Sequence, residues 1–372
     1  MRCSTKLFVA ALIMSAMARA IPASAADADL PVKSKPPQAK ELPFFLLIDD
    51  RFTVSWMPKG ADPGYYSLRA NGSVDGTTAK QVYSFTHFDI WTYGTNFFQI
   101  SMYKSDHNDP ANPCTNAGEI FNPGTFTLTR GSCAGATDFY GLFRSTFGWN
   151  EVFDTKAFTM GPLRNVSFEV GMDGQVSNTF LAPAKRDMVA GLQFQFALPY
   201  KGFFNVAPLL YYEFSNHDGF GQCGAGFVGP VPGVSCLVDG NMSYKPTWAV
   251  ETNYYMDLGF LPENMQFFSI SGRAAWYGPK GSELNPLPIA PPFNIGTAVE
   301  FNSEPIRLTF DASKALWGPK WSHYLDLWVA YRYWQNKFGL NHATSSICNI
   351  APGVSNNTCT ESTAYTGLTL KF

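Results

Sequence analysis

The chain has 372 residues and a formal net charge of −2, so no basic surface favours a nucleic-acid polymer as partner. Charged residues make up 15% of the chain and aromatic residues 16%, which is low and high, respectively, for a soluble protein. Beyond the first residues, no stretch approaches the ~20 consecutive apolar residues of a membrane helix, which excludes a helical membrane protein.

The N-terminal residues have the pattern of a secretory signal peptide. Arg2 and Lys6 are basic, an apolar run covers 7–17, and small residues occupy 23–25, where a signal peptidase would cut. A buried core helix is the alternative interpretation of this segment. We predict a signal peptide at 1–25, a Pro-rich periplasmic leader at 26–45 and an outer-membrane β-barrel at 46–372.

The barrel prediction rests on apolar and polar residues that alternate at every second position, as in strands between lipid and a polar lumen. A break in this alternation at Pro305 predicts a β-bulge. The number of strands predicted from this alternation is even, as closed bacterial barrels need. This favours an all-β fold, a closed antiparallel transmembrane β-barrel in the bacterial outer membrane. About twelve strands are predicted, at 46–56, 79–88, 94–105, 138–151, 163–173, 187–198, 203–214, 245–258, 265–277, 297–312, 323–338 and 362–372.

Six cysteines follow the predicted signal peptide, in three close pairs within Gly-, Pro- and Asn-rich segments. An even count in an exported chain predicts disulfides, and a metal site is the less favoured alternative because no pair has CxxC spacing. With both termini in the periplasm, all three pairs fall in outer loops and the short links form inner turns. The predicted disulfides join Cys114 to Cys133, Cys223 to Cys236, and Cys348 to Cys359.

The alternation also predicts which side chains face the lumen, because residues two apart on a strand share a face. Charges of both signs, with aromatic rings between them, would line a hydrated path for a small hydrophilic solute. The alternative is that the charges pair with one another and fill a narrow barrel. The predicted lumen residues are Arg51, Arg144, Glu169, Tyr211, Glu251, Tyr255, Arg273, Arg307, Asp326, Trp328 and Arg332.

Patterns for catalysis are weak. Ser215 and His217 could suggest a lipid-acting outer-membrane hydrolase, but such residues must meet in space with an orienting partner. They lie almost side by side where a strand runs into a loop, and adjacent strand residues point to opposite faces. The other histidines stand singly, without metal-ligand spacing. We therefore predict a protein that is not an enzyme, with no catalytic residues, metal or cofactor.

The last predicted strand ends on an aromatic residue. Leu368, Leu370 and Phe372 share one face of it, and polar residues occupy the other. Such a strand resembles the signal that the barrel assembly machinery reads in outer-membrane proteins, so Phe372 is the predicted assembly signal. The alternative, a soluble β-sandwich with a chance terminal Phe, would not need so many wide apolar faces.

Two patches resemble the nucleoside-specific, Tsx-like family of outer-membrane channels. Residues His87 to Phe98 are similar to a run that turns from the second strand of those channels into the third, with Thr95 in place of an acidic residue. Residues Tyr331 to Trp334 resemble a strand of the penultimate hairpin, and Asp29-Leu30-Pro31 looks like the mature start of α-proteobacterial porins. The resemblance implies a narrow twelve-stranded channel for nucleosides and related solutes.

The leading hypothesis is thus a monomeric outer-membrane channel for passive uptake of small hydrophilic solutes, nucleosides among them. Its expected partners are outer-membrane lipid, the solute and the barrel assembly machinery. The alternatives are the lipid-acting hydrolase and a structural or adhesive barrel with disulfide-stiffened loops.

Overall fold

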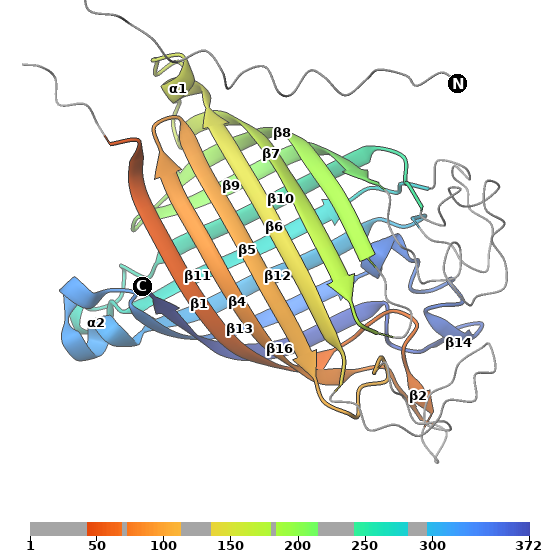
Figure 1. Cartoon of the computed structure of the whole chain (residues 1–372). Helices are drawn as coiled ribbons and strands as arrows, with labels where there is room; N and C mark the ends of the chain where they lie inside the picture. The colour runs from red at the N-terminus through yellow and green to blue at the C-terminus, as the bar shows by residue number, and fades with distance from the viewer. Residues whose placement is uncertain (1–42, 69–72, 113–134, 180–183, 215–241, 282–295) are drawn as a thin grey trace, which may run out of the picture. The chain divides into compact units, whose positions relative to one another are not determined.

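A closed antiparallel β-barrel forms the described part of the chain (Figure 1). The computed structural model describes residues 43–68, 73–112, 135–179, 184–214, 242–281 and 296–372. Within these ranges the strand order around the barrel is β1-β16-β13-β12-β11-β10-β9-β8-β7-β6-β5-β4. Each barrel strand pairs with the next one along the chain, and β1 pairs with β16 to close the ring. Closure leaves no unpaired strand edge in the barrel.

The predicted strands all correspond to strands of the barrel, which confirms the predicted fold class. Their ends differ by a few residues, the usual place for such errors. The barrel strands are β1 (Phe45–Gly60), β4 (Thr78–Trp91), β5 (Gly94–Ser105), β6 (Thr137–Gly148), β7 (Leu163–Ser177), β8 (Ala184–Leu198), β9 (Gly202–Glu213), β10 (Thr247–Asp257), β11 (Phe268–Tyr277), β12 (Glu300–Asp311), β13 (Leu325–Gln335) and β16 (Thr360–Lys371).

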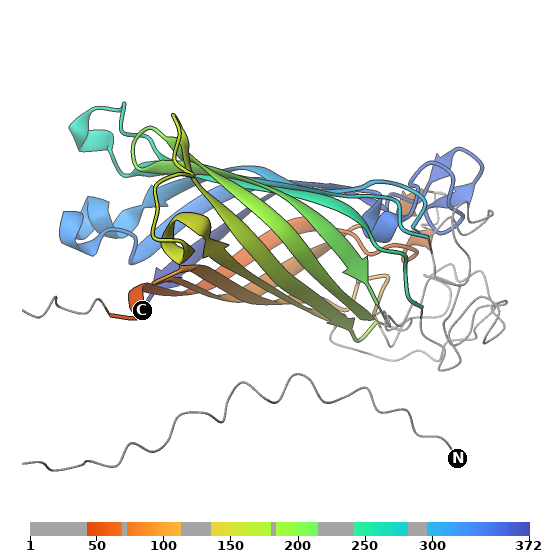
Figure 2. The ribbon, with the colours of Figure 1, turned by 90° about the horizontal axis from the view of Figure 1, so that it is seen from above.

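The two ends of the barrel carry different small elements (Figure 2). At the turn end, where β1 begins and Phe372 lies, are the helices α1 (Trp149–Val152) and α2 (Ala312–Trp317). At the loop end are two hairpins, β2–β3 and β14–β15. No helix among the described residues is both long and apolar enough to cross a bilayer. The remaining short elements are β2 (Ser67–Leu68), β3 (Val74–Asp75), β14 (Asn349–Ala351), β15 (Val354–Ser355), and the 3-10 turns η1 (Glu263–Met265), η2 (Pro319–Trp321) and η3 (Lys337–Gly339).

The faces of the strands follow the predicted alternation. On β13, Val329 is 55% exposed, whereas its neighbour Trp328 is 4% exposed because it points into the barrel. Leu327 and Tyr331 also face outward, and Asp326 and Arg332 are buried inside. The barrel therefore has an apolar exterior and a charged interior, the reverse of a soluble protein.

The bulge predicted at Pro305 is present in β12. The pairing of β12 with β13 shifts by one residue between Ser303 and Ile306, and its pairing with β11 shifts opposite Gly272. Pro305 and Ile306 both lie opposite Gly272 and face outward, so Glu304 and Arg307 on either side of them both point inward. A Cβ on Gly272 would lie 2.5 Å from the Pro305 carbonyl oxygen, so the close approach of the two strands here needs glycine.

Candidate functional site: the lumen of the barrel

A polar cavity of about 390 Å³ lies inside the barrel. Its walls come from β1, β4, β5, β10, β11, β12, β13 and β16, together with His323 before β13. Arginines, carboxylates and hydroxyl groups dominate the lining, with several aromatic rings between them. This composition is that of a hydrated space.

The structure divides the predicted lumen residues into two groups. Seven of them line the cavity: Arg51, Tyr255, Arg273, Arg307, Asp326, Trp328 and Arg332. The other four, Arg144, Glu169, Tyr211 and Glu251, lie inside the barrel in ion-pair and hydrogen-bond networks outside the cavity lining. The barrel interior thus contains both arrangements considered for the lumen charges: a polar cavity on one side and paired charges on the other.

The paired side of the lumen is organised by Arg144 on β6. Its guanidinium contacts Asp173 at 2.6 Å and Glu251 at 2.8 Å, and it lies 3.9 Å from Glu169. Glu251 belongs to β10, so this contact crosses the interior past β7, β8 and β9. Gln193 donates to Glu169 at 2.8 Å. Buried charges of this kind are stable only when their partners are all in place.

On the cavity side, Glu304 and Arg307 form a bidentate pair next to the bulge. Arg307 Nε lies 2.7 Å from Glu304 Oε1, and Nη2 lies 3.2 Å from Oε2. Tyr365 also donates to Glu304. The Arg307 guanidinium lies 3.9 Å from the centre of the Trp328 ring, which packs over Gly367. These contacts fix the arginine and the indole in one orientation on the cavity wall.

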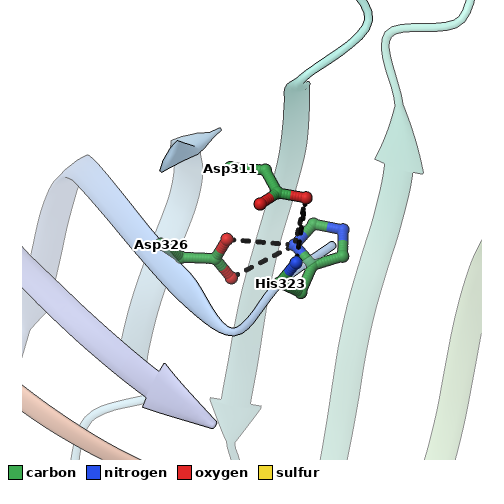
Figure 3. Close-up of side chains that lie close together, drawn as sticks. All are labelled: Asp311, His323 and Asp326. Carbon is green, nitrogen blue, oxygen red and sulfur yellow. Dashed lines mark hydrogen bonds and ion pairs between the residues drawn. The ribbon is translucent and has the colours of Figure 1, made fainter. Parts of the chain in front are cut away.

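A third group consists of Asp311, His323 and Asp326, whose side chains lie close together (Figure 3); His323 and Asp326 line the cavity. His323 Nδ1 lies 3.0 Å from Asp326 and 3.8 Å from Asp311, and its Nε2 is 3.3 Å from the Tyr255 hydroxyl. The hydrogen bond from His323 to Asp326 raises the pKa of the imidazole above its usual value. Arg51 Nη1 lies 3.7 Å from Asp326 Oδ2.

Asp311, His323 and Asp326 also offer three potential metal-ligand atoms within 4.8 Å of one another. The oxygens of Asp311 are already occupied. One accepts from the Lys314 backbone and the Ser313 hydroxyl, and the other from the Ser322 hydroxyl and the His323 backbone. This carboxylate therefore caps α2 and holds the turn that presents His323.

Further ion pairs lie inside the barrel toward its loop end. Lys80 bridges Asp62 and Asp138 at 2.8 and 3.0 Å. Lys337 and Arg332 share Glu361, at 2.7 and 2.8 Å. Lys185 and Lys280 both contact Glu213, and Tyr211 donates to the same carboxylate at 2.7 Å. Tyr211, placed in the solute path by sequence reasoning, is fully buried in this group.

One of the three predicted disulfides lies within the described residues. Cys348 and Cys359 form a disulfide whose cysteines are buried with Met242, Tyr244 and Leu340 at the loop end. Cys114, Cys133, Cys223 and Cys236 lie outside the described residues, as do the predicted signal peptide and the Ser215 and His217 pair.

The terminal aromatic residue lies at the turn end. Phe372 is 72% exposed, its backbone N–H donates to the Asp50 carbonyl, and its ring lies 6.3 Å from that of Phe85. Its role as an assembly signal stays a prediction.

Sequence reasoning missed several partners of the predicted residues. Asp173, Glu304, Glu361 and Tyr365 each complete a pair or network inside the barrel. Strand parity could have placed all four inside. Strand parity predicts the face on which a side chain lies, but not the distance across the lumen. That distance decides which inward charges contact one another.

A closed barrel with an apolar exterior satisfies its backbone hydrogen bonds internally and can face lipid all round. An even number of antiparallel strands, with a polar interior, is typical of bacterial outer-membrane barrels. The described strands therefore define an outer-membrane β-barrel, and the chain is placed in the bacterial outer membrane.

No protein-family model and no curated protein matches the sequence. Among solved structures, the chain is similar to an outer membrane channel from Pseudomonas putida F1, with 10% identity and a TM-score of 0.42, over 91% of this chain and 99% of that one. It is also similar to the outer membrane protein opdK from Pseudomonas aeruginosa, with 9% identity and a TM-score of 0.27, over 87% and 97% of the two chains. A BenF-like porin from Pseudomonas fluorescens Pf-5 shares 6% identity at a TM-score of 0.32, over 89% and 99%. The assignment as a barrel rests on the strand pairing of this chain itself.

Proposed function

We propose that the chain is an outer-membrane channel through which small hydrophilic solutes pass passively. The observation that supports this function is the polar cavity inside the barrel. A barrel with a purely structural role could fill its interior with side chains, as small barrels do. Here the space beside β1, β4 and β10 to β13 is left open and lined by groups that bind water.

The arrangement suits transient contact with a solute. Arg307 and Arg51 are held by carboxylates on the wall, so each presents a fixed donor and is not free to trap a ligand. Hydroxyl groups of Thr53, Ser84 and Thr86 lie along β1 and β4. Several weak contacts of this kind can replace part of a solute's hydration and still release it.

Nucleosides are the finer part of the proposal. Trp328 is covered by Arg307 and Gly367, and Tyr365 donates to Glu304. The other aromatic rings that line the cavity are those of Phe97, Tyr103 and Tyr255. Stacking of a base on such rings contributes about 1–3 kcal/mol, and the surrounding hydroxyl and amide groups can hydrogen-bond a ribose.

Conductance of the refolded full chain in planar bilayers tests the proposal. We expect stable single-channel steps, and faster swelling of proteoliposomes in uridine than of liposomes without protein. Ser271→Trp, which places a bulky ring in the cavity wall, should reduce both. The matched control is Leu210→Trp, at a residue that is 59% exposed on the barrel exterior. Absence of conductance from folded wild-type protein would contradict the proposal.

A binding role for the loop end is a second candidate. The disulfide between Cys348 and Cys359 closes the β14–β15 hairpin, on which Ile350 and Val354 are exposed. A receptor or adhesive surface would use such a stiffened apolar tip. Reduction that abolished binding to cells and left conductance unchanged would favour this role, whereas unchanged binding would count against it.

A further inference from the structure

We infer that Arg273, Asn253 and Ser271 form a subsite in the lumen for the carboxylate of a small organic acid. The inference deepens the proposed channel function, since it names a class of solute that the lumen would select. All three side chains line the cavity, from the paired strands β10 and β11.

Arg273 is the arginine of the cavity without an ion pair among the described residues. Arg51, Arg307 and Arg332 each contact a carboxylate. The side chain of Arg273 is exposed to the cavity, and no hydrogen bond or ion pair joins it to the described part of the chain. A guanidinium with all its donors open is a strong site for an oxyanion.

The two carboxylates nearest to Arg273 in the sheet are already engaged. Glu304 pairs with Arg273 in the strand register, but its oxygens are held by Arg307 and Tyr365. Glu251 is two residues from the partner of Arg273 on β10, and both its oxygens are held by Arg144. Both neighbouring glutamates thus contact other arginines, and Arg273 makes no ion pair within the described part of the chain.

Two neutral donors stand beside this guanidinium. Asn253 is the direct strand partner of Arg273, and its carbonyl oxygen accepts from Asn205 at 3.1 Å, which leaves its amide N–H groups for the cavity. Ser271 lies on the same face of β11, two residues away, and its hydroxyl has no partner among the described residues. An amide and a hydroxyl next to a guanidinium provide donors for both oxygens of a carboxylate.

The charged side chains in the rest of the cavity also favour an anionic solute. Four arginines line it, Arg51, Arg273, Arg307 and Arg332, against two carboxylates, Glu304 and Asp326. The lining side chains from β4 and β5 carry no charge and are hydroxyl, amide and apolar groups. An anion on Arg273 would therefore meet no unpaired carboxylate across the cavity. The planar fork of the guanidinium matches the planar geometry of a carboxylate in particular.

The test combines permeation with direct binding on the refolded full chain. In a KCl gradient, the reversal potential of wild-type protein should show preference for chloride, and added lactate should block the current. In Arg273→Gln, the chloride preference should fall and the half-blocking concentration of lactate should rise by ~10-fold, as expected for loss of one charge-assisted contact. The matched control Arg164→Gln removes an exposed arginine of β7 outside the cavity and should change neither value by more than about twofold.

Two further variants separate specific recognition from a general field. Arg273→Lys keeps the charge and should keep the chloride preference, but should weaken the block by lactate because the fork is lost. Asn253→Ala combined with Ser271→Ala should weaken lactate block and leave the chloride preference in place. If Arg273→Gln and Arg164→Gln behave alike, the subsite is disproved.

Saturation-transfer NMR on lactate with folded protein in micelles gives a readout that does not need conduction. A signal that Arg273→Gln abolishes supports the subsite even if no current is seen, and the channel proposal alone would then fail. Conduction with no Arg273-dependent signal or block would overturn the subsite and leave the channel. Tighter Arg273-dependent block by inorganic phosphate than by lactate would overturn the carboxylate assignment, and block by uridine alone would do the same.

Discussion

Arg144 on β6 forms an ion pair with Glu251 on β10, with Nη2 and Oε1 2.8 Å apart. The strands β7, β8 and β9 lie between them in the barrel, so the contact fixes the separation of two parts of the wall that are not neighbours. Asp173 and Glu169 complete the arrangement on β7. The lumen is therefore divided, with charges closed on themselves beside β6 to β9 and the cavity on the other side.

Arg144→Met should strongly destabilise the barrel. The change leaves Glu251 and Asp173 inside the barrel without their arginine, and breaking a buried ion pair costs about 3–5 kcal/mol. The midpoint of urea unfolding of refolded protein in lipid vesicles measures the loss. Glu251→Gln should cost less, since Arg144 keeps Asp173. Arg164→Met, at an exposed arginine, is the control, and equal midpoints for the two arginine variants would show that the network is not needed.

Gly272→Ala should weaken the barrel at the bulge. The new methyl group would lie 2.5 Å from the Pro305 oxygen and 2.7 Å from the Tyr254 ring, and such overpacking costs about 1–3 kcal/mol. Gly174→Ala on β7 is a matched control because nothing approaches its Cβ closer than 4.0 Å. The comparison uses urea midpoints of the two variants. A Gly272→Ala barrel as stable as Gly174→Ala would mean that the bulge adapts freely.

Loss of the disulfide should loosen the loop end and leave the barrel intact. Cys348 and Cys359 are 11 residues apart, and closing a loop of this length contributes about 3 kcal/mol. In Cys348→Ser combined with Cys359→Ser, limited proteolysis should cut within the β14–β15 hairpin. Heat-dependent gel migration, which reports the folded barrel, should remain as in wild type. Cleavage inside barrel strands would show that the loop end supports the whole fold.

Stability should depend on pH through His323. A raised pKa means that the folded state binds the proton more tightly than the unfolded state. The stabilisation is full below the ordinary histidine pKa of about 6.5 and is lost as pH rises through the higher folded value. Asp326 and Asp311 favour the charged ring, and Arg51 opposes it. Unfolding midpoints at pH 5.5 and 8.5 should differ more for wild type than for His323→Gln, and an identical difference would refute the assignment.

The strands were predictable because a barrel in lipid needs an apolar residue at every second position. The run from Leu325 to Val329 shows this directly, and the break at Pro305 marks the bulge without any structure. Strand parity also placed Arg273 and Arg307 inside correctly, since only the direction of the side chain matters for that step.

The division of the lumen could not be predicted from parity. Arg144 and Arg273 have the same residue type and both point inward, yet one is enclosed by carboxylates and the other is open. The difference depends on how far apart β6 and β10 lie, which is a property of the closed barrel and not of either strand. Asp311 shows the same limit, because its role as a cap depends on a turn that brings back Ser322 and His323.

The bulge in β12 has a consequence for how such a lumen can change over evolutionary time. In a regular strand, residues three apart face opposite sides, so Glu304 and Arg307 could not both be inside. One extra residue places both on the inner wall, where they form their bidentate pair. A single-residue insertion can thus move a charge from the lipid side to the water side without any substitution. Insertions and deletions within strands, and not only exchanges of side chains, are therefore a route by which a barrel of this kind could acquire a new solute.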